Sequence, residues 1–294
     1  MVALRDDAPP SRVAWPRSVR RPWLLGREFF AARDQHRLMQ DDLPEGRRAF
    51  LASRFRNLDH LLRSRYAWMN DWLTPNSRIA EFGTGAGFSR LYLNQPVILT
   101  DVFANLWLDV SMDAVRMAFA AESLDAIMIS NALHHFSAPA RFLVEADRVL
   151  KPGGTILINE SYASLLLRLI LRVTRHEGYS YDVDVFDHEA IANDPNDPWS
   201  GNNAISNLLF GSKEQFRRRF EQLEIVLDEP CECLSFLASG GVTSKVRVPE
   251  LSGPVLNWIA AIDRLLVGAA PGLFALSRRV VLKKAAASAA NHRR

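Results

Sequence analysis

The stretch that decides the fold of this chain is Glu81-Phe82-Gly83-Thr84-Gly85-Ala86-Gly87-Phe88. An apolar run at residues 78–80 precedes it and a helix-like segment at 89–93 follows it, so the order is strand, glycine turn and helix. Glycine lets the backbone turn tightly and lets a ligand approach the main chain without meeting a Cβ atom. Because a helix N-terminus also leaves backbone N–H groups unpaired, the stretch predicts a nucleotide-type pocket.

Two common phosphate-binding motifs do not fit this stretch. No Gly-Lys-Ser/Thr follows the glycines, so the Walker A interpretation fails. A dinucleotide fingerprint needs Gly or Ala at the sixth position counted from Gly83, and Phe88 occupies that position. The spacing Glu-x-Gly-x-Gly-x-Gly instead resembles motif I of the class I S-adenosylmethionine-dependent methyltransferases, in particular their small-molecule, type 11-like members.

The resemblance continues downstream and covers residues 78–160. An apolar run at 96–100 ends in Asp101, where an acidic residue at the tip of the second strand can accept hydrogen bonds from both ribose hydroxyls. Residues 106–114 are similar to the family's third strand, which ends here in Asp113-Ala114, the place where the family usually contacts the adenine edge. Each match alone is weak, but their order and spacing together are specific.

The fourth strand of the family is matched by residues 124–131, and the following helix, turn and fifth strand by 142–160. The resemblance implies a doubly wound, Rossmann-like α/β fold. It has a seven-stranded, mostly parallel sheet, an N-terminal helical lid and an insertion after strand five. The implied cofactor is S-adenosylmethionine. The implied cofactor-contacting residues are Glu81, Phe82, Gly83, Thr84, Gly85, Gly87, Asp101, Val102, Met112, Asp113, Ala114 and Asn131, with Glu81 expected to hold the glycine turn.

One departure from the family pattern lies between the second and third strands. A crossover helix needs about ten or more residues, and Phe103-Ala104-Asn105 cannot supply it. We therefore expect a loop in place of that helix, which leaves one edge of the adenine pocket more open than usual.

The chain divides into five segments. We expect a basic arm and helical lid at 1–75, a cofactor-binding core at 76–160, a substrate-lid insertion at 161–222, C-terminal strands with an inserted helix at 223–284, and a flexible tail at 285–294. Apolar spacing also predicts individual elements. These are helices at 23–40, 46–73 and 216–220, strands at 223–227 and 277–282, and a loop without elements at 176–203.

Charge is nearly balanced over the whole chain. The 36 basic and 33 acidic residues give a net charge of +3, too even to indicate nucleic acid binding by itself. The basic bias is local, with Arg12, Arg17, Arg20, Arg21 and Arg27 crowded at the start. A solvated arm fits this pattern. Peripheral contact with an anionic membrane face fits it as well, since each basic group near such a surface contributes about 1 kcal/mol.

The remaining composition favours a cytoplasmic protein. No signal peptide fits the start, and charged residues interrupt the apolar stretches at 165–170 and 255–276, so neither is a convincing membrane span. Cys231 and Cys233 lack the second pair that a zinc site needs, and we expect reduced thiols. The apolar side of a predicted helix around 256–266 is expected to pack in the core or in a homodimer contact.

His134 and His135 are the candidate catalytic residues, because they follow strand four at the mouth of the expected cleft. Leu133-His134-His135-Phe136-Ser137 resembles, in part, the Leu-His-Asp-Trp-Ser run of small-molecule O-methyltransferases, in which the histidine is the general base. Such a base contributes about 10²–10⁴-fold. Paired histidines also occur in members that methylate carbon, and they can simply cap the strand. Methyl transfer from a sulfonium needs no metal, and we expect none.

The candidate substrate residues are Glu160, His176, Trp199 and Asn203. Glu160 ends strand five, where it can orient an acceptor, bond the lid or pair with a basic residue such as Lys151. The other three lie in the polar loop 176–203, and a loop of that length is usually functional or disordered. Trp199 with its Asn and acidic neighbours suits a sugar, although loop capping explains Asn203 equally well.

The sequence thus predicts an S-adenosylmethionine-dependent methyltransferase that acts on a small or carrier-linked acceptor, with O-methylation of a sugar, a glycan lipid or a natural product as the main hypothesis. The alternatives are a quinone or other C-methyltransferase, and a non-catalytic scaffold with a methyltransferase-like fold. Absence of the Asn/Asp-Pro-Pro-Tyr signature argues against nucleic acid as the acceptor, since strand four ends in Ser130-Asn131-Ala132-Leu133.

Overall fold

A computed structural model describes residues 28–29, 33–174, 177–197, 199–240 and 248–286. Several predicted features lie outside the described residues. They are His176, the five arginines of the N-terminal arm and most of the C-terminal tail.

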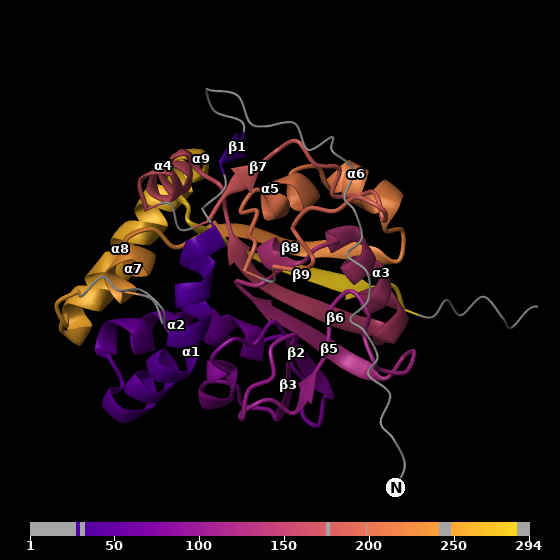
Figure 1. The fold of residues 1–294 in the computed structure, drawn as a ribbon, viewed down its shortest axis with the longest axis horizontal. Helices are drawn as coiled ribbons and strands as arrows, with labels where there is room; N and C mark the ends of the chain where they lie inside the picture. The colour runs from indigo at the N-terminus through magenta and orange to yellow at the C-terminus, as the bar shows by residue number, and fades with distance from the viewer. Residues whose placement is uncertain (1–27, 30–32, 175–176, 198, 241–247, 287–294) are drawn as a thin grey trace, which may run out of the picture.

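A seven-stranded sheet forms the centre of the molecule, in the order β4-β3-β2-β5-β6-β9-β8 (Figure 1). Its strands are β2 (Ile79–Phe82), β3 (Val97–Asp101), β4 (Val110–Ser111), β5 (Leu124–Ser130), β6 (Leu150–Ser161), β8 (Leu223–Cys231) and β9 (Ser277–Lys284). Pairing is parallel from β4 to β6, whereas β9 pairs antiparallel with both β6 and β8. The predicted doubly wound, mostly parallel sheet is confirmed.

Both faces of the sheet are covered, which explains the near-continuous apolar runs of its central strands. Alternate residues point to opposite faces. Thus Phe82, Ile127 and Ile156 share one buried cluster with side chains of helices α3 (Pro139–Val149), α5 (Ile205–Phe210) and α6 (Lys213–Arg219). Figure 1 shows where these three helices lie against the sheet.

The other face packs against the N-terminal helices α1 (Arg33–Ser53) and α2 (Arg56–Asn70). There Ile79, Leu99 and Met128 share a cluster with side chains of both helices. Two helices were expected in this region, but the break falls at Arg54 and Phe55 rather than at residues 41–45. Arg54 has a positive φ of 50°, which interrupts the helical backbone.

The strands next to the glycine turn are linked mostly by loops. As expected, no helix lies between Asp101 and Val110. The helix expected at 89–93 is only a four-residue 3₁₀ turn, η1 (Phe88–Leu91), and the third strand expected at 106–114 is only the two residues of β4. Helix α3 and the N-terminal helices therefore supply most of the regular structure around this part of the sheet.

The insertions form a helical flank at one side of the molecule (Figure 1). Helix α4 (Leu165–Thr174) follows β6, while α7 (Leu234–Ser239), α8 (Gly253–Ala269) and α9 (Pro271–Phe274) lie between β8 and β9. The loop 176–203, expected to lack elements, contains strand β7 (Tyr179–Ser180), which pairs with β1 (Glu28–Phe29), and a bridge from Gly178 to Asn202. No helix of the described residues is long and apolar enough to cross a membrane.

Candidate active site

The glycine turn leaves the carboxyl end of β2, and two of its glycines have no room for a side chain. Gly83 has φ +65°, and a Cβ atom there would lie 2.4 Å from Cβ of Ala132. Gly87 has φ +63°, and a Cβ atom there would lie 2.8 Å from Cδ1 of Trp107. Because other residues rarely adopt this left-handed conformation, the sequence can make the turn only with glycine at these places.

Glu81 holds the turn from inside the protein, as the sequence predicted. Its carboxylate is 1 % exposed and accepts hydrogen bonds from Thr84 Oγ1 at 2.6 Å, from the Ser89 hydroxyl and from the Tyr66 hydroxyl at 3.3 Å. Burial raises the pKa of Glu81, and these three donors oppose that rise. Glu81 therefore positions the turn and does not face the ligand space.

Asp101 ends β3 beside the turn. Its carboxylate accepts hydrogen bonds from the backbone N–H of Gly85 at 2.9 Å and of Phe103 at 3.2 Å. Burial raises the pKa of Asp101, and the backbone donors counteract this. Each carboxylate oxygen has two lone pairs, so Asp101 can still accept hydrogen bonds from a ligand in front of the turn.

A cavity of about 170 Å³ opens at these strand ends. A Cβ atom on Gly85 would meet nothing within 4 Å, so the cavity reaches the bare backbone of the turn. That open backbone beside a carboxylate suits an adenosyl ligand with ribose hydroxyls. The predicted cofactor residues that line the cavity are Gly83, Gly85, Asp101, Val102, Met112, Asp113, Ala114 and Asn131, and those that do not are Glu81, Phe82, Thr84 and Gly87.

A second hollow of about 750 Å³ lies between α6 and the strands β8 and β9. It is lined by charged side chains of both signs, such as Glu224 and Lys283, and by no residue of the glycine turn. We therefore place the functional site at the smaller cavity.

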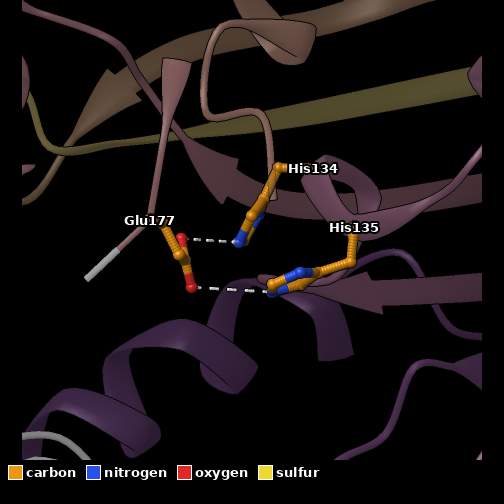
Figure 2. A group of neighbouring side chains, drawn as sticks. All are labelled: His134, His135 and Glu177. Atoms are coloured by element: carbon orange, nitrogen blue, oxygen red, sulfur yellow. Dashed lines mark ion pairs between the residues drawn. The ribbon is translucent and has the colours of Figure 1, made fainter. Parts of the chain in front are cut away.

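The two histidines follow β5 in a short 3₁₀ turn, η2 (Leu133–His135), and Figure 2 shows both rings turned toward Glu177. Nδ1 of His134 contacts the Glu160 carboxylate, and its Nε2 lies 3.3 Å from Oε2 of Glu177. Nε2 of His135 lies 3.7 Å from Oε1 of Glu177, and its Nδ1 lies 3.2 Å from the carbonyl oxygen of Ser200.

Glu160 is enclosed by groups that donate to it. Its carboxylate accepts hydrogen bonds from the backbone N–H of Leu133 at 2.7 Å and of Ser161 at 2.6 Å, in addition to the His134 contact. Lys151, which the sequence offered as a partner, pairs with Asp125 instead. Glu160 is fully buried and does not line the cavity. Its carboxylate contacts His134 instead of the cavity, and a role toward the acceptor stays a prediction.

The two imidazoles have opposite electrostatic states. Burial lowers the pKa of His134, but Glu160 and Glu177 together outweigh burial and raise it to about 10. Burial and the neighbouring charge of His134 lower the pKa of His135 to about 4. At neutral pH His134 is therefore a fixed cation between two carboxylates, while His135 is a neutral ring.

The long insertion supplies the walls around the histidines. The side-chain amide of Asn193 donates to the carbonyl oxygens of His134 at 2.7 Å and of Phe136 at 3.0 Å. Asn203 is 3 % exposed and donates to Glu177 at 2.8 Å, so it supports the site without lining the cavity. Trp199 does line the cavity, where it stacks on Phe103 at a centroid distance of 5.6 Å.

Three side chains could also hold a metal ion, although the sequence analysis expected none. His134, His135 and Glu177 each offer a ligand atom within 4.8 Å of the others. However, both ring nitrogens of His134 already face carboxylates, and a proton on that ring accounts for both contacts. A protonated His134 ring and a bound cation are thus two alternative ways to hold these three side chains together.

Sequence reasoning missed several residues of the cavity wall, namely Leu43, Phe103, Phe136 and Asp194. Leu43 comes from α1 and Asp194 from the long insertion, so neither lies near the glycine turn in sequence. Asn193 was missed for the same reason. No local motif marks Leu43, Asn193 or Asp194, because only the packing of distant segments brings them to the strand ends. Phe103 and Phe136, in contrast, closely follow β3 and η2.

Comparisons with known proteins find a matching family model and similar solved structures. A family model described as Methyltransferase domain matches residues 80–158, which run from β2 to β6. The solved structures that resemble the chain include an S-adenosylmethionine-dependent methyltransferase from Archaeoglobus fulgidus, at 18% identity and a TM-score of 0.47, covering 80% of this chain and 98% of that one. Another is the YcgJ protein from Bacillus subtilis, at 17% identity and a TM-score of 0.44, covering 76% and 99%. A search of the curated proteins finds no match.

The sheet order, the glycine turn and the acidic end of β3 define a Rossmann-like class I methyltransferase fold. Residues 80–158 belong to the methyltransferase domain family, and the chain is an S-adenosylmethionine-dependent methyltransferase. Its cofactor is accordingly S-adenosylmethionine, which carries its transferable methyl group on a sulfonium sulfur.

Proposed function

We propose that this enzyme methylates an oxygen atom of a small or carrier-linked acceptor, such as a sugar, a glycan lipid or a natural product. The observation that carries the proposal is the position of the His135 ring, which lines the cavity together with Asn131 and Ala132. Burial and the neighbouring His134 also lower the pKa of His135, which favours the neutral ring. A hydroxyl acceptor needs a group that takes its proton in the transition state, and a neutral imidazole can do so.

The hydrogen bonds of His135 favour one tautomer. A carbonyl oxygen can only accept, so the contact with Ser200 keeps the proton on Nδ1 and leaves the lone pair on Nε2. Nε2 faces Glu177, and a hydroxyl placed between them could donate to either group. We therefore assign the proton-accepting role to His135, supported by Glu177.

His134 was the first candidate for the general base, but its surroundings favour a different role. It is 4 % exposed, does not line the cavity and stays protonated between two carboxylates at neutral pH. We propose that it positions Glu177, and that Glu160 in turn positions His134.

The aromatic wall of the cavity supports an acceptor with hydroxyl groups. Nε1 of Trp199 is buried and has no hydrogen-bond partner among the described residues. A buried donor of this kind usually finds a partner, and an acceptor oxygen would satisfy it. One face of Trp199 stacks on Phe103, and Trp199 also meets the His135 ring in a T-shaped contact, so an acceptor beside His135 would lie next to the indole as well.

The test starts by incubating cell extract with isotope-labelled S-adenosylmethionine and identifying the labelled product by mass spectrometry. With that acceptor, His135→Ala should lower kcat by about 10²–10⁴-fold without weakening cofactor binding in calorimetry. His188→Ala, a histidine substitution in the insertion and outside the cavity wall, serves as the matched control.

The pH profile adds a second readout. Because the pKa of His135 is lowered to about 4, kcat/KM should show no acid limb near the ordinary histidine pKa of about 6.5. Label found on carbon, or full turnover by His135→Ala, would contradict the proposal. A quinone product would favour the C-methyltransferase alternative.

A further inference from the structure

Helix α4 has an apolar face that the described residues leave exposed. Leu165, Leu169 and Val173 lie four residues apart, so they share one side of the helix, and they are 55 %, 57 % and 73 % exposed. On the opposite side, Leu167 and Leu171 are each only 5 % exposed and pack inside. The second apolar face is therefore not needed for the core.

Helix α8 repeats this arrangement. Val255, Trp258 and Leu265 fall on one side at helical spacing, and they are 42 %, 66 % and 73 % exposed. Leu256 and Val267 are buried on the other side. Leu265 is thus outside the core, where Leu256 and Val267 pack instead, and a homodimer contact at this helix stays a prediction.

The two exposed faces border one another. Leu166 of α4, Leu266 of α8 and Phe274 of α9 pack in one cluster, which holds the three helices together. Figure 1 shows α4, α9 and α8 following one another along the same flank. Leu273 of α9 adds a further exposed apolar side chain at 47 %. We call these outward faces of α4, α8 and α9 the apolar flank.

Charge on the apolar flank has a single sign. Its basic residues are Arg168, Arg172 and Arg264, and the three helices contain one acidic residue, Asp263. Asp263 is 5 % exposed and accepts hydrogen bonds from the backbone N–H groups of Cys233, Leu234 and Ser235 at the start of α7. The buried Asp263 carboxylate therefore cannot neutralise the positive charge of the arginines at the surface.

From this pattern we infer that the apolar flank docks on an anionic lipid bilayer, and that the methyl acceptor is carried there on a lipid. Leucine, valine and tryptophan on one face with arginine beside them are the features of helices that lie in a membrane interface. Anionic head groups attract the arginines, whereas a second copy of the flank would offer them no exposed carboxylate. The part about the acceptor rests on the proposed function.

The position of α4 in the chain connects the apolar flank to the active site. The helix begins five residues after Glu160 and ends three residues before Glu177. Both carboxylates contact His134. A bilayer at α4 would thus lie next to the segment that carries the acceptor side of the site.

Binding of the full-length protein to vesicles tests the docking. We expect the protein to sediment with vesicles of equal parts phosphatidylglycerol and phosphatidylcholine, and less with phosphatidylcholine alone or at high salt. The double variant Leu169→Ser, Leu265→Ser should bind at least about tenfold more weakly. Leu106→Ser is the matched control, because Leu106 is fully exposed but lies outside the apolar flank.

A second readout locates the contact. Lipids with brominated acyl chains should quench tryptophan fluorescence in the wild type and less in Trp258→Phe. No vesicle binding would overturn the inference. Vesicle binding that persists in the double variant but is lost when the N-terminal arginines are replaced would also overturn it. A dimer in solution that dissociates in the double variant would overturn it as well.

Cofactor calorimetry separates this inference from the proposed function. The double variant should keep wild-type affinity for S-adenosylmethionine, so a failed vesicle assay with intact cofactor binding would reject only the docking. In the labelling experiment on cell extract, product in the organic-solvent fraction supports a lipid-carried acceptor. Product confined to the aqueous fraction would overturn that part.

Discussion

The two rims of the active-site cavity are built by different physical means. The glycine-turn rim depends on backbone conformation and on local hydrogen bonds, such as the one from Gly85 N to Asp101. The histidine rim depends on buried charges brought together from distant segments, with His134 held between Glu160 and Glu177. The glycine-turn rim therefore forms the site for the cofactor. The histidine rim contains side chains that can bind or release a proton, and it lies where we propose that the acceptor binds.

The largest effect should come from breaking the histidine rim. Glu160→Ala removes the buried partner of His134 and the acceptor of the Leu133 and Ser161 N–H groups. Loss of one member of a buried ion pair costs about 3–5 kcal/mol, which urea denaturation would measure as a lower free energy of unfolding. In contrast, Glu189→Ala removes the exposed partner of Arg141 and should cost less than about 1 kcal/mol. Equal losses of unfolding free energy in Glu160→Ala and Glu189→Ala would contradict the claim that buried charges hold the histidine rim together.

The glycine-turn rim should respond to sterics instead of charge. Gly83→Ala places a methyl group against Ala132 in a left-handed conformation, and we expect a loss of about 2–4 kcal/mol in unfolding free energy. Gly85→Ala has the same kind of φ but open space around it, so it should cost only about 1 kcal/mol. Its methyl group would enter the cavity, however, and should weaken cofactor binding in calorimetry. If both variants lost the same stability, the close approach to Ala132 would be unimportant.

A smaller effect is expected from the carboxylate between the two rims. Asp101→Ala should weaken binding of S-adenosylmethionine by about 1–3 kcal/mol, because ribose hydroxyls would lose their acceptor. Titration calorimetry measures this loss, and Asp109→Ala, which removes a carboxylate outside the cavity wall, is the control. Unchanged affinity in Asp101→Ala would mean that the nucleoside does not lie at the end of β3.

The most specific effect is a pH dependence of the histidine rim. The pKa of His134 is raised in the folded protein from about 6.5 to about 10. Its stabilising contribution is therefore complete below pH 6.5 and is lost as the pH rises through about 10. The difference in unfolding free energy between wild type and His134→Gln should shrink over that window. A difference that stays constant would show that His134 is not charged at neutral pH.

The same contrast explains what the sequence could predict. The turn at Gly83, the carboxylate at Asp101 and the order of the strands follow from short motifs, because each is determined by residues close in sequence. The role of Glu160 did not follow, since its partner His134 lies 26 residues away and is reached only across β5 and β6. The exposed apolar stripe of α8 was also missed. Apolar spacing predicts where a helix lies, but it does not tell which of two apolar faces packs in the core.

The most direct test of this account is a crystal structure of the protein with S-adenosylmethionine bound. We predict the nucleoside in the cavity beside Gly85, with its ribose hydroxyls on Asp101 and its adenine near Asp113, and the sulfonium end toward His135. Ligand density elsewhere, or an Asp101 carboxylate turned away from the ribose, would contradict the central claim that this rim holds the methyl donor.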